Sequence, residues 1–193
     1  MSETIAGMKA KQLFIFFFLL SVSVFGQTTS KFSRNEVIED LKTLHESLKE
    51  SHYNLFAYTT EQHFDSVYHN ISQRIIQDSL SLLETVKHFQ GLVATVNNGH
   101  TEIDFPSGSY REYAYAQGTV FPLELAFEDG ASFIRKNFSN RDEIKIGAEI
   151  ISINGETMPQ ILAKIYPQIS AERSYFKNAK IESPEYKNIS NII

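Results

Sequence analysis

The chain has 193 residues, enough for one ordinary domain or two small ones, and 42% of them are hydrophobic, enough to bury a core. Its net charge of -5 argues against nucleic acid as a partner, because a surface that binds nucleic acid needs clustered Lys and Arg to neutralise phosphates. The absence of cysteine excludes disulfides, thiolate metal sites and a cysteine nucleophile.

Residues 1–26 have the composition of a secretory signal peptide. Lys9 and Lys11 precede an apolar run from Leu13 to Phe25, and Gly26 offers a small residue for cleavage. The run of about 13 residues is short for a helix that crosses a bilayer, which needs about 20. We therefore expect an exported protein, periplasmic or secreted, that meets the membrane only through this transient signal peptide. An uncleaved membrane anchor is the alternative.

Residues 27–100 are predicted to form a helical region. Ser33 begins a capping-box pattern, Thr60 can cap a second helix, and Asp78 or Ser79 can cap a third. Apolar residues then recur at three- and four-residue steps in each segment, and the third carries the broadest apolar stripe. That helix is expected to be the most buried and to end at 97–99, Asn-Asn-Gly, which tolerates the left-handed conformation.

From residue 101 the apolar period changes from 3.6 to 2, which predicts a β unit over residues 101–170. Thr101–Phe105 and Thr119–Glu128 are the first expected strands, separated by a turn or loop at 106–109. Asp129-Gly130 and Asn154-Gly155 predict tight hairpin turns, and a short helix is expected from Glu156 or Thr157. Residues 171–193 show no clear period and are predicted to be an irregular or truncated tail. The expected fold class is α+β.

The histidines give one candidate for catalysis. None of the six histidines has a recognised metal-ligand spacing, so the sequence predicts neither a metal nor another cofactor. His100 differs from the others because it lies between the third helix and the β unit, where the backbone is fixed from both sides. A neutral imidazole there could accept a proton from a serine hydroxyl. The residues alone favour an ordinary junction histidine that bonds a nearby carbonyl.

A second candidate is the loop formed by Gly118, Thr119, Val120 and Phe121. A glycine-containing loop that opens onto a strand can present N–H groups to a peptide carboxylate while the strand edge pairs with the peptide. Pro122 counts against this role because it removes one ladder donor. An ordinary strand that enters a small barrel is the favoured alternative.

The order of these features resembles the N-terminal half of secreted C-terminal processing (tail-specific) serine peptidases, especially their tricorn-like branch. Asn98-Gly99-His100-Thr101 stands in the place of the D-G-H-T that often ends the family's helical region. Gly147–Gly155 is similar to the G-x-x-I-x-x-I-N-G signature that closes a PDZ-type peptide-binding domain. The resemblance spans roughly residues 32–169.

The resemblance implies hydrolysis of peptide bonds in peptides or unfolded proteins by a serine nucleophile, with His100 as general base. The branch often has serine immediately before this histidine, whereas this chain has Gly99. The family's nucleophilic serine lies in a βα core that follows the PDZ-like region, and that core is absent here. We therefore expect the N-terminal part of an exported peptidase, inactive alone. A non-catalytic exported peptide-binding module is the alternative, and a structural domain without a ligand is a third possibility.

Overall fold

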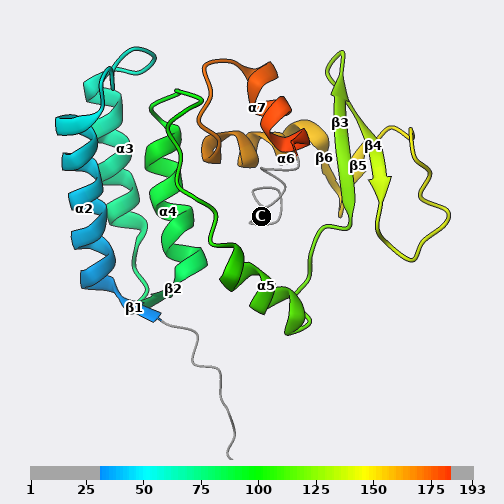
Figure 1. Ribbon diagram of the computed structural model, residues 1–193, viewed down its shortest axis with the longest axis horizontal. Coiled ribbons are helices and arrows are strands. Elements are labelled where there is room, and N and C mark those ends of the chain that lie inside the picture. The colour runs from blue at the N-terminus through cyan, green and yellow to red at the C-terminus, as the bar shows by residue number, and fades with distance from the viewer. Residues whose placement is uncertain (1–30, 184–193) are drawn as a thin grey trace, which may run out of the picture.

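The structure is a computed structural model that describes residues 31–183. The predicted signal peptide and its cleavage site lie outside the described residues, as do residues 184–193. Within the described range, no helix combines the length and the apolar character needed to cross a membrane. The architecture is α+β, as expected, with three helices and one short strand pair at one end and the remaining short antiparallel strands at the other (Figure 1).

The three predicted helices are present and lie side by side. They are α2 (Arg34–Ser51), α3 (Glu61–Arg74) and α4 (Leu82–Ala94). The predicted caps of the first two are confirmed. The Ser33 side chain accepts from the Glu36 N–H in a full capping box, and the Thr60 side chain accepts from the His63 N–H.

The start of α4 differs from the prediction, because Ser81 is its cap instead of Asp78 or Ser79. Residues Ser79–Ser81 form strand β2, which pairs antiparallel with β1 (Lys31–Ser33). Leu80 in this strand is buried against the helices. Burial of this leucine and the strand pairing hold residues 79–81 extended, so the helix begins only after Ser81.

Replacement of Ser81 by alanine tests this assignment. The Ser81 Oγ accepts from the Glu84 N–H, and the Glu84 carboxylate accepts from the Ser81 N–H. Loss of the hydroxyl leaves the Glu84 N–H without its acceptor at the start of α4, so Ser81→Ala is expected to lower the free energy of unfolding by about 1 kcal/mol. Urea unfolding measures the change. Ser79→Ala is the matched control and is expected to change stability by less than about 0.5 kcal/mol. If Ser79→Ala is more destabilising than Ser81→Ala, Ser79 is the cap of α4, as predicted from the sequence.

The apolar faces of the three helices meet in one core. Phe64, Leu41 and Leu92 are fully buried there. Of the three helices, α4 has the most buried residues, as its broad stripe predicts. The remaining buried members of this core are Val37, Leu55, Ile71, Ile75, Leu80 and Val96.

Two predictions for residues 101–118 are wrong. Residues 101–105 form no strand, and the predicted loop at 106–109 instead begins helix α5 (Ser107–Tyr115). A strand needs a neighbour for its ladder, and residues 101–105 pair with no strand in the described part of the chain. The Ile103 N–H donates instead to the Gln90 side chain. None of the residues of α5 is buried, so its sequence carries no apolar stripe strong enough to reveal it.

The strands are shorter than predicted but are joined by the predicted turns. Strand β3 (Leu123–Glu128) pairs with β4 (Ala131–Asn137), and β5 (Ser152–Ile153) pairs with β6 (Glu156–Thr157). Both central residues of each turn have positive φ: 49° and 83° at Asp129-Gly130, and 52° and 85° at Asn154-Gly155. This is the type I′ geometry that Asn-Gly and Asp-Gly favour. The described strands form two-stranded ladders and no closed barrel.

Helix α6 (Met158–Ile165) has Thr157, one of the two predicted start residues, as its N-cap, and it leads into the short 3₁₀ helix η1 (Tyr166–Gln168). The segment from residue 171 was expected to be irregular, but it contains helix α7 (Ser174–Glu182). Ile181 of α7 packs with Ile165 and Ile169 in a second core. The helix lies between α4 and β3, so it contacts the turn that follows α4 (Figure 1).

Candidate functional site

The turn at residues 97–101 ends α4 and carries His100. Asn97 has a φ of 52°, the left-handed conformation that stops a helix. Thr101 N–H donates to the Asn98 carbonyl oxygen at 2.9 Å, and His100 N–H donates to the Asn98 side-chain oxygen at 2.9 Å. His100 is exposed, whereas Gly99 beside it is buried. The backbone is therefore fixed, and the imidazole faces solvent.

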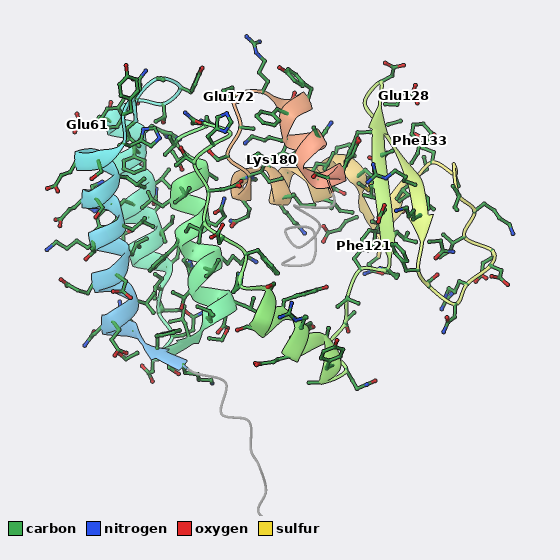
Figure 2. All side chains as sticks on the ribbon, in the orientation of Figure 1. Glu61, Phe121, Glu128, Phe133, Glu172 and Lys180 are labelled. Atoms are coloured by element: carbon green, nitrogen blue, oxygen red, sulfur yellow. The ribbon has the colours of Figure 1, made fainter. Side chains whose placement is uncertain are left out.

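The segment 170–180 holds this turn by its main chain, and we call it the clamp. Ser170 Oγ accepts from the Asn98 N–H at 3.1 Å and donates to the Asn98 carbonyl at 2.7 Å. Glu172 Oε1 accepts from the Gly99 N–H at 3.1 Å, and Lys180 Nζ donates to the Gly99 carbonyl at 2.7 Å. All the main-chain polar groups of Asn98 and Gly99 are thus bonded. Figure 2 shows Glu172 and Lys180 between α4 and the strands.

Phe176 of α7 explains the glycine before His100. A Cβ atom added at Gly99 would lie 2.3 Å from Cε1 of the Phe176 ring. No side chain fits at that distance without displacement of the ring. The packing of α7 in this chain therefore disfavours the serine that the resemblance leads one to expect before the histidine.

Two charges of opposite sign flank the turn. Lys180 is only 2% exposed, and its ammonium group pairs with the Glu102 carboxylate at 2.9 Å. On the other side, hydrogen bonds from the backbone N–H groups of Glu172 itself and of Gly99 hold the pKa of the Glu172 carboxyl below its usual value. The nearby His100 and Lys180 charges lower this pKa further. Glu172 is thus an anion at neutral pH, bonded to the residue before His100.

His52 ties the loop between α2 and α3 to the same turn. Its Nε2 lies 2.8 Å from the Thr101 hydroxyl oxygen, and its Nδ1 accepts from the Asn54 N–H. An acceptor role for Nδ1 in the neutral ring leaves the proton on Nε2, which then donates to Thr101. The turn is therefore held from the helical side as well as by the clamp.

The other histidines show no metal site. Among residues 31–183, no group of three or more potential ligands comes together. His63 and His69 are exposed on α3, and burial lowers the pKa of His88 on α4. His45 stacks on Phe64 and Tyr68 and lies 2.7 Å from Asp65 through Nε2.

The His45–Asp65 pair predicts a pH-dependent contribution to stability. Hydrogen bonds from His45 and then Lys49 hold the pKa of Asp65 below its usual value. A carboxyl whose pKa is lower in the folded state stabilises the fold above its unfolded pKa of about 4, and this contribution is lost as the pH falls through the lowered value. Asp65→Asn is therefore expected to destabilise the protein at pH 7 and to have little effect near pH 2. Urea unfolding at both pH values measures this, and an equal effect at both would contradict it.

The predicted peptide-binding loop is partly occupied by a helix end. Gly118 N–H donates to the Tyr113 carbonyl and Gln117 N–H to the Ala114 carbonyl, the two bonds of a Schellman motif after α5. The Gly118 N–H is therefore engaged within the chain. Thr119 and Val120 are exposed, and Phe121 lies at the base of β3 (Figure 2). A peptide-binding role for Thr119–Phe121 stays a prediction.

The edge of β3 also has an internal partner. The Phe127 N–H donates to the Glu182 carboxylate at 2.7 Å, and Arg135 donates to the Glu182 carbonyl. The end of α7 thus occupies a donor that an added peptide strand would use.

The residues of the clamp were not among the sequence candidates. Lys180 and Glu172 lie in the segment expected to be irregular, and Ser170 at its border. Their bonds to the turn join positions 72 to 81 apart in the chain. A fully buried lysine has no signature in the sequence, although the four-residue spacing of Phe176 and Lys180 could have suggested one face of a helix.

Comparison with known proteins gives a distant structural likeness. The sequence matches no protein-family model, and no curated protein matches it. The structure is similar to the crystal structure of a serine-to-alanine mutant of CPAF, a tail-specific, tricorn-like serine protease, with a TM-score of 0.51 and 14% identity. The match covers 81% of this chain and 27% of the CPAF chain, so the matched part spans about a quarter of the length of that chain. The likeness shows a shared fold.

Proposed function

We propose that this chain is the N-terminal part of an exported serine peptidase, in which His100 is the general base. The observation that carries the proposal is an exposed imidazole on a turn whose backbone is fixed from two sides. The shared fold with a serine protease supports the reaction class. Peptides or unfolded proteins are the substrates proposed from the resemblance.

The chemistry needs a second component. An imidazole promotes amide hydrolysis by taking the proton of a serine hydroxyl as that oxygen attacks the carbonyl carbon, while backbone N–H groups stabilise the developing oxyanion. Ser170 is the serine bonded to the turn, but it is 1% exposed and its hydroxyl is engaged with both main-chain groups of Asn98. It is a structural residue, and the nucleophile is proposed to lie in a separate βα core, as the resemblance implies.

The segment from β3 to α6 is proposed to be a PDZ-like unit of the same peptidase. Its support is the sequence Gly147–Gly155 and the type I′ turn at Asn154-Gly155 that leads into α6. The occupied donors at Gly118 and Phe127 make a stand-alone peptide-binding module the weaker candidate.

The proposal is tested by a hydrolysis assay on two proteins. One is this chain alone, and the other is this chain fused to the serine-bearing βα core of a C-terminal processing peptidase, called the joined protein below. The chain alone is expected to show no cleavage of an unfolded protein substrate, since the proposal places the nucleophile and the oxyanion hole in the βα core. The joined protein is expected to cleave it. Cleavage by the chain alone, or none by a folded joined protein, would contradict the proposal.

A further inference from the structure

Glu172 is the acidic residue of the clamp, and its carboxylate is bonded to the main chain immediately before His100. It accepts from the Gly99 N–H at 3.1 Å. We propose that Glu172 is the positioning residue for His100, an assignment that rests on the proposed function of this histidine.

The carboxylate is itself held in place. It accepts from the backbone N–H of Glu172 as well as from that of Gly99, so two main-chain donors orient it. A carboxylate fixed in this way costs no reorganisation when a nearby group becomes charged. An imidazolium formed by proton transfer to His100 would therefore meet a negative charge already in position.

Gly99 leaves the position before His100 without a hydroxyl. A side chain there would require the Phe176 ring to move, because the ring fills the space of a Cβ atom. Glu172 supplies from the clamp the polar group that a glycine at position 99 does not supply. On the opposite side of the turn, the Lys180 ammonium group donates to the Gly99 carbonyl and forms an ion pair with Glu102.

Two variants separate position from charge. Glu172→Gln keeps an oxygen that accepts from the Gly99 N–H but removes the negative charge, and Glu172→Ala removes both. Glu128→Gln is the matched control, because Glu128 is an exposed glutamate at the tip of β3, away from the turn (Figure 2).

The first measurement uses the full chain and does not depend on catalysis. NMR hydrogen exchange is expected to show that the Gly99 amide exchanges about tenfold or more faster in Glu172→Ala, since a bond to a charged acceptor is lost. Glu172→Gln is expected to restore most of the protection, and Glu128→Gln to change nothing. Amides of α2 report that each variant is folded. In the unmodified chain the Gly99 amide proton shift is expected to follow the Glu172 carboxyl titration, with a pKa below the usual 4.5, and this step disappears in Glu172→Gln.

The second measurement uses the joined protein. Glu172→Ala is expected to lower kcat by about tenfold or more with KM nearly unchanged, and Glu172→Gln to give an intermediate kcat. Unchanged Gly99 exchange in Glu172→Ala, or an unchanged kcat in a protein that requires His100, would overturn the assignment. If His100 itself proves dispensable, the proposed function fails instead, whatever the exchange data show.

Discussion

Replacement of His100 by alanine in the joined protein is expected to lower kcat/KM by about 10²–10⁴, because a general base contributes that factor to the rate. The loss should fall mainly on kcat, since the imidazole acts on the proton transferred in the transition state and adds little to substrate binding. His100 is exposed and its side chain supports no core, so the variant is expected to fold with nearly unchanged stability.

His63→Ala is the control for this experiment. His63 is exposed on α3, and its substitution removes an imidazole of the same size without a change near the turn. Activity within about twofold of the parent is expected for it. Retention of activity within about tenfold by the His100→Ala joined protein would remove the basis of the proposed mechanism.

Gly99→Ser is expected to destabilise the chain by about 3 kcal/mol, at the upper end for an overpacked site. The new Cβ would lie 2.3 Å from a Phe176 ring atom, so the ring, α7 or the turn has to move. Each of these movements also disturbs the bonds from Glu172 and Lys180 to Gly99. Urea unfolding measures the loss, and hydrolysis by the joined protein is expected to fall with it.

A double variant identifies the cause. Phe176→Ala opens the space that a serine side chain at position 99 needs, so the combined variant is expected to be less destabilised than the sum of the single changes. Gly108→Ser is the matched control, because an added Cβ there meets nothing within 4 Å. If Gly99→Ser is as mild as Gly108→Ser, the close approach of Phe176 does not determine the residue at this position.

The local features of the fold could be predicted from the sequence. The helix caps at Ser33 and Thr60 and the turns at Asp129-Gly130 and Asn154-Gly155 depend on residues a few positions apart. Their hydrogen bonds and backbone angles follow from the chemistry of those residues alone.

The errors arise where a local pattern is weak or is overridden. Helix α5 buries none of its residues, so hydrophobic periodicity could not reveal it. Residues 101–105 alternate as a strand does but pair with none of the described strands, and the Ile103 N–H bonds a side chain instead. The cap of α4 moved to Ser81 because the pairing of β2 with β1 kept the preceding residues extended. In the last two cases tertiary contacts overrode a local pattern.

The residues of the candidate site also differ in whether the sequence could predict them. His100 could be singled out because it lies in a short motif at the end of a predicted helix. Ser170, Glu172 and Lys180 could not, since their role arises only when the clamp packs on a turn more than 70 positions earlier. The peptide-binding prediction at Gly118 did not foresee α5, whose end uses the Gly118 N–H.

The most direct measurement is a crystal structure of the joined protein. We expect an imidazole nitrogen of His100 to lie about 2.6–3.2 Å from the oxygen of the nucleophilic serine, with the turn still bonded to Ser170, Glu172 and Lys180. A folded and active joined protein in which another residue contacts that serine, and His100 points away from it, would contradict the account.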